Sequence, residues 1–491
     1  MRIPRTLTLL LPPAILAGIL LAFYLNTLAP GLTWANYGSD GGDLITAAAT
    51  GGVPHPSGYP LYLLVARLFQ VLPLGTLAFR TNLLSALAVT AACVLVYGLA
   101  ARSLPFADGR PNWAAGLASA LAFGLAPLVW SQAVVTEVYG LHSLFVVIIL
   151  YLSSDVRPGF FTPRRLDLAL GVTFGLSLGN HVTTVLLLPL LFSAGALPDP
   201  SRRSAILRRL AWLMGTALLV YLTLPLRAFF DPPINWNDPV TWQGFVSLVS
   251  GGLYQGKLLS LAPLEVWERL RSAAGLLLDQ AGIVGLALAS LGLIVFFKPT
   301  ALYRHTLWIA VINLAFALVY GTHDSFVYLI PTCLGFALWI GMGLAGILSA
   351  LPPRLGPALG LALTIFLLLL GFSHRPLVDA SGDQRAEAFG RQVLALAPAD
   401  AVIYARGDRA VFTLWYFHFA LHERPDVAVI SSELLGYDWY QENLASTYPD
   451  LHLPGPISFA ERMAALNPGR AACYVEYVDR AQIACYPAQI P

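Results

Sequence analysis

The chain has 491 residues, of which 57% are hydrophobic and 11% are charged, whereas soluble domains carry about 25% charged residues. This composition indicates a membrane protein, with the lipid bilayer as its surroundings, and excludes a purely soluble enzyme. The net charge of +2, from 29 basic and 27 acidic residues, leaves no excess positive charge for a polyanion. No Lys/Arg block interleaved with aromatic residues occurs, so nucleic acid is not an expected partner.

Hydropathy predicts about eleven membrane-spanning helices, some shorter than the usual 20 residues. The first apolar run follows a basic tip, but it is longer than a signal-peptide core and no A-x-A cleavage site follows, which predicts an uncleaved helix. The predicted spans are residues 8–29, 80–101, 113–130, 138–153, 167–180, 182–196, 205–226, 273–297, 306–321, 325–349 and 356–373.

Basic residues predict the orientation of these spans. They occur in alternate connections, which the positive-inside rule assigns to the cytoplasm together with the N-terminus. The members are Arg2, Arg5, Arg102, Arg110, Arg157, Arg164, Arg165, the RRSAILRR cluster at 202–209, Lys298, Arg304 and Arg354. Arginines on both sides of 167–196 predict a hairpin there. The other connections, 30–79, 131–137, 179–181, 227–272 and 322–324, then share the outer face with everything after 373.

The composition becomes polar after about residue 375, which divides the chain into a multispan domain, 1–373, and a small extracytoplasmic α/β domain, 374–491. The stretch DAVIYARGDRAVFTLWYFHFALHERPDVAVISSE predicts strand, turn, helix, strand. The stretch CYVEYVDRAQIACYP alternates like a hairpin, and its cysteines, Cys473 and Cys485, are either bridged in an oxidising compartment or two buried thiols.

The most unusual stretch, GSDGGDLITAAATGGVPHPSGYPLY, spans residues 38–62. Asp40 and Asp43 are three residues apart, so a short helix would place both carboxylates on one face, in the first turn where negative charge is favoured. A helix cap and an ordinary surface acid would give the same pattern. His55 follows between two prolines that restrict the backbone, and this favours a shaped site.

Three further groups of polar residues fall near the outer ends of predicted spans. Ionisable groups at membrane depth are costly and mark cavities or function, although helix-end snorkelling, structural hydrogen bonding and helix capping are the alternatives. The groups are Glu137, Tyr139 and His142; Asn180 and His181; and His323 with Asp324.

The long outer connection interleaves aromatic residues, amides and carboxylates with prolines. Asn235 and Trp236 lie in INWNDP, and Arg227 and Lys257 bracket the loop. This mixture suits a carbohydrate, whose faces stack on aromatic rings while amides and carboxylates bind hydroxyls. A belt of interfacial Trp and Tyr would give a similar composition.

Several of these stretches resemble one family, the DUF2723 family of transmembrane protein O-mannosyltransferase-like proteins, within the C-type (GT-C) membrane glycosyltransferases. The family's first outer loop has an Asp-x-Gly-Glu element and a His-Pro-Pro-Gly-Tyr-Pro-Leu-Tyr string, which residues 40–43 and 55–62 resemble. RTNLLSAL, TEVYGLH, GNH, INWNDP and GDRAVFTLWYFHFALHERPDVAVI are also similar. The family's Glu is Asp43 here, and Ser57 replaces the second Pro.

The resemblance implies a GT-C-like helical fold and a glycosyltransferase that moves a hexose, mannose-like, from a polyprenyl-phosphate donor to a hydroxyl of a protein Ser/Thr or a glycan on the non-cytoplasmic face. An acid of the first outer loop is central in such enzymes. We expect an inverting single displacement with Asp40 as base and Asp43 orienting the acceptor or exchanging roles with it. The donor phosphate is assigned to His55, Arg227 and His181, with Lys257 and His323 ranked after them. The expected substrate-binding residues are Tyr59, Glu137, Tyr139, His142, Asn180, Asn235, Trp236 and Asp324.

The sequence leaves a divalent metal open, because Asp40, Asp43 and His323 are suitable hard ligands, but it shows no metal-specific spacing and no cofactor is assigned. Two other functions compete with glycosyl transfer. A transporter or flippase of lipid-linked sugars has similar spans and acids, although the expected paired halves are not visible. A membrane assembly protein would use the outer domain to bind a partner, but so many spans exceed what an anchor needs. In a prokaryote the chain would be an integral multi-pass protein of the cytoplasmic membrane.

Overall fold

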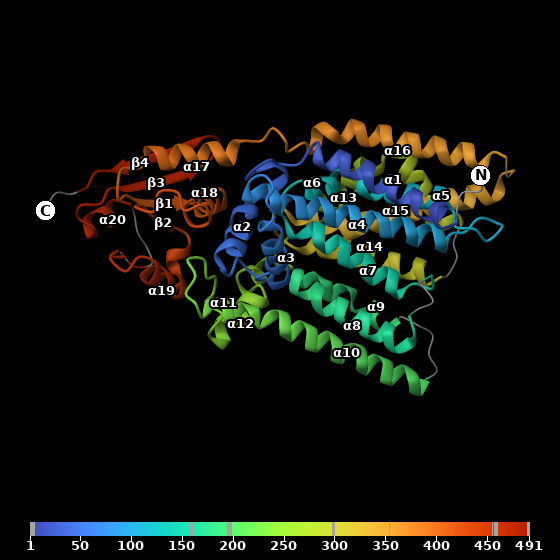
Figure 1. The fold of residues 1–491 in the computed structure, drawn as a ribbon, viewed down its shortest axis with the longest axis horizontal. Coiled ribbons are helices and arrows are strands. Elements are labelled where there is room, and N and C mark those ends of the chain that lie inside the picture. Colours follow the sequence, from blue (N-terminus) through green and yellow to red (C-terminus); the bar gives the residue numbers. More distant parts are fainter. Residues whose placement is uncertain are drawn as a thin grey trace.

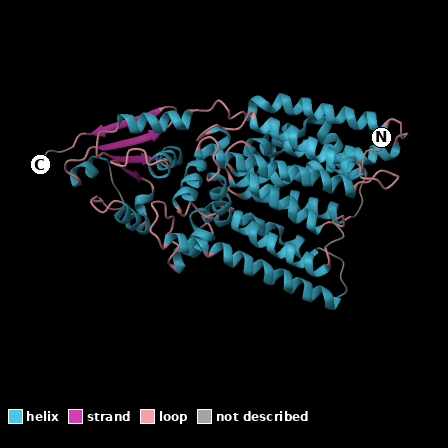
Figure 2. Cartoon of the chain, viewed as in Figure 1, coloured by secondary structure: helices cyan, strands magenta, loops and turns pink. Residues whose placement is uncertain are grey.

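A computed structural model describes residues 5–488 except 157–160, 194–198, 297–299, 353, 454 and 456–459. The chain forms an elongated molecule in which a helical bundle occupies one end and a small sheet with its helices the other (Figure 1). All strands lie in the sheet end, beyond the bundle (Figure 2). The predicted fold class, a helical membrane body with a small C-terminal α/β part, is confirmed. Arg2, Arg157 and Lys298, used above for orientation, lie outside the described residues.

Helices occupy all eleven predicted positions. They are α1 (Arg5–Leu25), α4 (Leu77–Ser103), α5 (Trp113–Gly124) with α6 (Pro127–Ala133), α7 (Val138–Ser153), α8 (Pro163–Asn180), η2 (Val182–Leu187) with α9 (Leu188–Ser193), α10 (Asp199–Tyr221), α13 (Pro263–Ser290) with η4 (Leu291–Val295), α14 (Ala301–Val319), η5 (Ser325–Leu329) with α15 (Ile330–Ala350), and α16 (Gly356–Val378). The end of the predicted span 182–196 and the last residue of 273–297 lie outside the described residues.

The number of full-length apolar spans is smaller than eleven. In the described part of the chain, six helical segments are long and apolar enough to cross a bilayer, and the pair α5 and α6, bent by 67°, makes a seventh. Pro127 begins α6 at this bend, since proline cannot continue the hydrogen-bond ladder of the preceding helix. The apolar parts of α1, α7 and the η2–α9 segment are shorter helices.

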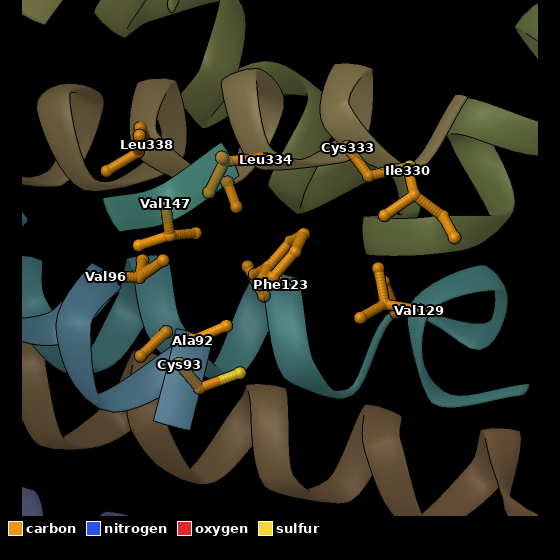
Figure 3. Packing of buried hydrophobic residues seen from close by; sticks show 14 of the residues in the cluster. Ala92, Cys93, Val96, Phe123, Val129, Val147, Ile330, Cys333, Leu334 and Leu338 are labelled. Atoms are coloured by element: carbon orange, nitrogen blue, oxygen red, sulfur yellow. The ribbon is translucent and has the colours of Figure 1, made fainter. Parts of the chain in front are cut away.

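The core of the bundle is built from small and branched side chains. Residues of α4, α5, α6, α7 and α15 interdigitate there, with Phe123 at the centre of the view and Cys93 and Cys333 buried as free thiols (Figure 3). Close backbone approach is a general device for packing membrane helices. At Gly343 of α15, an added Cβ would lie 2.1 Å from the carbonyl oxygen of Leu288 in α13, so these two helices meet where only glycine fits.

Short helices of the outer connections gather where the bundle meets the sheet. They are η1 (Ala35–Asp40), α2 (Gly41–Thr50), α3 (Pro60–Gln70), α11 (Thr223–Ala228), α12 (Trp242–Val249) and η3 (Gly252–Lys257). In Figure 1, α2, α3, α11 and α12 all lie at this junction, whereas the N-terminus lies at the opposite end of the bundle. The polar segments predicted to share one side of the membrane therefore lie together.

The C-terminal unit has a four-stranded sheet in the order β2-β1-β3-β4. β1 (Val402–Arg406) is parallel to β2 (Ala428–Ser431) and to β3 (Ala472–Tyr477), and β4 (Ala481–Tyr486) is antiparallel to β3. The helices of the unit are α17 (Arg385–Leu396), α18 (Asp408–Trp415), the π-turn η6 (Tyr416–Ala420), η7 (Leu434–Gly436), α19 (Asp438–Thr447) and α20 (Ala460–Leu466). The predicted strand, turn, helix, strand order and the final hairpin are confirmed.

The β3–β4 hairpin pairs Cys473 with Cys485 in register, and a disulfide joins them. Of the two alternatives left open by the sequence, the bridge is the one observed.

The sheet unit shares its hydrophobic core with the outer connections of the bundle. Trp34, Ile45 and Val53 from the first connection pack in the same buried cluster as residues of β1, β2 and α18. Asp383 fastens the two parts further: its carboxylate accepts hydrogen bonds from Thr33 Oγ1 at 2.6 Å and from the backbone N–H of Trp34 at 3.0 Å and Ala35 at 2.8 Å. The domain boundary predicted after residue 373 falls inside α16, which continues to Val378.

Candidate functional site

The first outer connection contains three short helices, η1, α2 and α3, with a proline-rich loop between α2 and α3. Asp40 immediately precedes α2, which ends at Gly51 in the left-handed conformation, φ 75°, as is common at helix C-termini. The loop after α2 forms an isolated parallel β-bridge between Val53 and Asn235 of the long outer connection. Pro60 starts α3 and, with the prolines on either side of His55, fixes where the imidazole points.

His55 lies between the two predicted carboxylates. Its Nδ1 is 2.7 Å and its backbone N is 2.9 Å from Asp43 Oδ2, while its Nε2 is 3.6 Å from Asp40 Oδ2. The two acids differ in exposure, because the Asp43 side chain is 0% exposed and the Asp40 side chain is 34% exposed. Asp43 therefore holds the imidazole from behind, whereas Asp40 faces the open side.

The electrostatics of the pair follow from this geometry. Burial opposes protonation of His55, but the negative charges of Asp40 and Asp43 outweigh it and raise the pKa of His55 to about 9. The same surroundings raise the pKa of Asp40, because the low-polarity walls disfavour its charge more than His55 favours it. The site thus has a cationic imidazole at neutral pH and a carboxylate more basic than a solvated one.

These groups line a cavity of about 430 Å³ at the junction of the bundle and the sheet unit. Of the residues predicted for the site, seven lie in its wall: Asp40, His55, Tyr59, Glu137, Tyr139, His181 and Asp324. They come from the first connection, from the start of α7, from the α8–η2 turn and from the α14–η5 turn. The structure therefore brings together clusters that are up to 284 positions apart in sequence, from 40 to 324.

Four predicted residues support the wall from behind without lining this cavity. Asp43 accepts from Trp236 Nε1 at 3.4 Å as well as from His55, and the Trp236 ring packs edge-on against His55. Asn180 donates to the backbone oxygen of Val138 at 3.2 Å. His142 packs against His181, with ring centroids 5.1 Å apart, and lines a smaller adjoining void.

Four others lie outside the wall. Asn235 donates to Asp238 Oδ1 at 3.1 Å within its own loop, and Arg227 donates to the backbone oxygen of Gly52 at 3.3 Å. Lys257 is exposed at the end of η3. His323 is exposed and lines a different cavity with Arg269. Among the described residues that line the main cavity, none is Lys or Arg, so of the residues predicted to bind the donor phosphate, His55 and His181 are the two that lie in its wall.

Sequence reasoning missed several wall residues. Six tyrosines line the cavity, Tyr37, Tyr59, Tyr139, Tyr254, Tyr320 and Tyr328, and only two of them were assigned. Asp408 and Phe412 of α18 complete the wall from the C-terminal unit. Asp408 follows the carboxyl end of β1, a common position for binding residues in α/β sheets, so a signal existed. Loss of solvation at the cavity wall and the negative charge of Asp40 raise the pKa of Asp408 to about 6.

The carboxylates and imidazoles of the cavity are the groups that would bind a metal ion. In the described ranges no group of three or more His, Cys, Asp or Glu side chains is arranged to hold a metal ion. His323, the third ligand considered from sequence, lines a cavity other than the one that contains Asp40.

The fold is that of the C-type membrane glycosyltransferases. The structure is similar to ArnT from Cupriavidus metallidurans in the apo state, with a TM-score of 0.62 and 13% identity over 99% of both chains. It is also similar to the same protein bound to undecaprenyl phosphate, with a TM-score of 0.59 and 14% identity over 97% of this chain and 94% of that one. The oligosaccharyltransferase of Archaeoglobus fulgidus gives a TM-score of 0.51 at 13% identity, over 99% of this chain and 75% of that one.

Sequence comparison finds similarity to proteins described as protein O-mannosyl-transferases. The family model described as the protein O-mannosyl-transferase TMEM260 N-terminal domain matches residues 40–196, and TMEM260-associated domain 2 matches residues 386–462. The chain is 29% identical to protein O-mannosyl-transferase TMEM260 of Mus musculus, over 85% of this chain and 62% of that protein. It is 24% identical to the Dictyostelium discoideum protein of the same description, over 86% and 57%. The chain thus spans about three fifths of the length of these curated relatives.

Proposed function

We propose that this chain is a membrane glycosyltransferase that moves a mannose-like hexose from a polyprenyl-phosphate donor to a hydroxyl acceptor, a protein Ser/Thr or a glycan, on the non-cytoplasmic face. The observation that carries the proposal is the Asp40–His55–Asp43 arrangement at the wall of the junction cavity. The similarity to proteins named O-mannosyl-transferases and to a structure that holds undecaprenyl phosphate supports the donor and the reaction class.

In the proposed reaction the acceptor oxygen attacks the anomeric carbon while the bond from that carbon to the phosphate oxygen breaks. Asp40 takes the proton of the acceptor hydroxyl, and its raised pKa suits this task because a more basic carboxylate is a better general base. The electron pair of the broken bond stays on the polyprenyl phosphate. A single displacement of this kind inverts the anomeric configuration.

The imidazolium of His55 stabilises the departing phosphate. Its Nδ1 is engaged by Asp43, so Nε2 remains for the substrate. The 3.6 Å separation between Nε2 and Asp40 Oδ2 is longer than a hydrogen bond, so each atom is able to bond a substrate group of its own. Tyrosine hydroxyls of the wall supply further donors to the phosphate and the sugar.

The test uses the purified protein in lipid with radiolabelled mannosyl- or glucosyl-phosphoryl polyprenol. Wild type is expected to transfer label to a hydroxyl acceptor, and Asp40→Asn is expected to lose this activity. Asp108→Asn is a matched control, because Asp108 is an exposed acid whose side chain pairs with Arg110 in the 104–112 connection, outside the cavity. Label that crosses the bilayer without forming a new bond would instead identify a carrier, and label that stays with the donor while the sheet unit binds a partner would identify an assembly protein.

A further inference from the structure

We propose that Asp408, supplied by the C-terminal unit, accepts a hydrogen bond from a backbone N–H of a Ser/Thr-bearing polypeptide and thereby positions the acceptor hydroxyl against Asp40. The inference rests on the proposed glycosyl transfer and deepens it by assigning the acceptor side of the cavity and choosing a polypeptide as the acceptor.

Asp408 is placed for this role by the turn that follows β1. Gly407, with φ 80°, reverses the chain direction between the strand and α18, and Asp408 is the first residue of that helix. Its side chain is exposed to the cavity that Asp40 and His55 also line. Within the described residues the Asp408 carboxylate has no hydrogen-bond or ion-pair partner, so it is available to a substrate.

The arginines on either side of Asp408 have other contacts. Arg406 lies 3.9 Å from Glu433, and the Arg409 guanidinium stacks over the Trp34 ring at 5.9 Å. Neither arginine therefore forms an ion pair with Asp408 within residues 405–409. The carboxylate faces the cavity without a cation of its own.

Three contacts fix α18 to the loop that carries the proposed base. The Phe412 ring stacks on the His55 ring, with centroids 6.2 Å apart and planes at 15°. Trp34 Nε1 donates to Thr413 Oγ1 at 3.1 Å. A Cβ at Gly42 would lie 2.4 Å from the Phe412 carbonyl oxygen, so the backbones of α2 and α18 touch. Asp408 is thus held at a constant position relative to Asp40.

The chemistry of the acceptor explains why a second carboxylate is useful. A hydroxyl has one proton to donate, and in the reaction that proton goes to Asp40. A second acceptor group must therefore bind a different donor on the same molecule. In a polypeptide the backbone N–H groups beside the Ser or Thr are such donors, and their hydrogen bonds to a carboxylate are stronger than neutral ones.

The carboxyl groups of the cavity suit an acceptor that offers hydrogen-bond donors. Its described wall contains four of them, those of Asp40, Glu137, Asp324 and Asp408, and no Lys or Arg. A polypeptide segment supplies such donors, because every residue except proline carries a backbone N–H.

The experiment compares wild type with Asp408→Asn, using a Ser-containing peptide and a set of the same peptide methylated in turn at each backbone nitrogen near the Ser. Asp408→Asn is expected to raise the KM for the peptide about tenfold or more, and to raise the KM for the lipid donor much less. One N-methyl peptide is expected to react poorly with wild type and to lose nothing further with Asp408→Asn, because the two changes remove the same hydrogen bond.

Asp438→Asn is the matched control, since Asp438 is also an exposed first residue of a helix in the same unit, α19, but lies outside the cavity wall. It is expected to behave as wild type, and the melting temperature of each variant is measured to confirm folding. An Asp408→Asn variant with an unchanged KM for the peptide overturns the inference, as does a wild type that glycosylates glycans but no peptide. In both cases label still leaves the donor, whereas absence of donor cleavage by wild type would contradict the proposed function itself.

Discussion

Asp40 and Asp43 have the same side chain and lie three positions apart, yet their surroundings give them different roles. Asp43 is fully buried and bonded to the imidazole, the backbone N–H of His55 and the indole of Trp236. A carboxylate committed to three donors is a poor base for a substrate, because accepting a proton would break those bonds. Asp40 is the acid that lines the cavity, and in the proposed reaction Asp43 is a positioning residue that acts through His55.

Replacing Asp43 with Asn separates these roles. The variant keeps the size of the side chain but removes one of the charges that, with that of Asp40, raise the pKa of His55, so we expect transfer to fall by about 10-fold to 100-fold and the free energy of unfolding to fall by about 1–3 kcal/mol. Transfer rates and thermal melts of Asp43→Asn, beside Asp108→Asn, measure both effects. An unchanged pH profile together with an unchanged rate would contradict the assignment.

The raised pKa of His55 predicts how stability and activity depend on pH. A group whose pKa is raised from 6.5 to about 9 by folding contributes stability that is fully present below about pH 6.5 and is lost as pH rises through 9. Transfer should decline over the same alkaline range, because the imidazolium beside the leaving phosphate disappears. Rates and melting temperatures measured from pH 6 to 10 test this, and Asp43→Asn should move the decline to lower pH. A decline that stays in place in that variant would assign it to another group.

Some of the site could be predicted from local sequence, and the rest depends on distant pairing. The prolines around His55 and the closely spaced acids marked a loop that lines the cavity, and Glu137, Tyr139, His181 and Asp324 marked helix ends that line it too. Charge alone could not show which residues share a wall, which is why Arg227 and Lys257 were expected beside the phosphate but lie outside it. Asp408 follows a predicted strand, but nothing local links it to Asp40.

Among the elements, the contact between α2 and α18 holds the helix that brings Asp408 and Phe412 to the cavity wall. Gly42→Ala would place a methyl group 2.4 Å from the Phe412 carbonyl oxygen, and the backbones must separate to admit it. We expect a loss of about 1–3 kcal/mol in stability and a larger loss of transfer than of donor binding. Gly436→Ala, where an added Cβ meets nothing within 4 Å, is the control for thermal melts and transfer assays. Equal behaviour of the two variants would show that the contact is loose.

A buried ion pair joins α8 and α10 in the bundle. Asp167 is 1% exposed and accepts from Arg209, 2% exposed, at 2.7 Å and from Arg208 at 2.6 Å. Removing one partner leaves an uncompensated buried charge, so Asp167→Ala should cost about 3–5 kcal/mol. Unfolding of purified protein in detergent measures this loss, and Asp108→Ala, at an exposed pair, should change stability by less than about 1 kcal/mol. A loss of the same size in both variants would argue against a buried pair.

The positions of the membrane helices could be predicted from hydropathy, because the length of an apolar run is a property of the local sequence. The number of full spans could not, since bends such as the one before Pro127 and helices as short as α7 depend on neighbours that supply the missing contacts. The strand order β2-β1-β3-β4 was also out of reach, because β3 pairs with β1 across a long insertion.

The molecule as a whole presents its cavity at one end, between bundle and sheet, and the direction of that end in the membrane is a further prediction. The distribution of arginines places it outside the cytoplasm. In intact cells, a cysteine introduced by Asp438→Cys should react with a membrane-impermeant maleimide, whereas one introduced by Asp108→Cys should react only after permeabilisation. The native Cys93 and Cys333 are buried and do not compete. The reverse pattern would place the N-terminus outside and overturn the predicted orientation.

The hydrogen bonds from Thr33, Trp34 and Ala35 to Asp383 also bear on the order in which the protein matures. Thr33 and Asp383 are 350 positions apart, and at about 5–20 residues per second the ribosome needs about 20–70 s to make the intervening chain. During that time the first outer connection, with Asp40 and His55, lacks both its hydrogen bonds to Asp383 and its packing against α18. A nascent chain can therefore insert its first spans long before the cavity wall is complete, and any activity of the cavity must wait until α18 has been made.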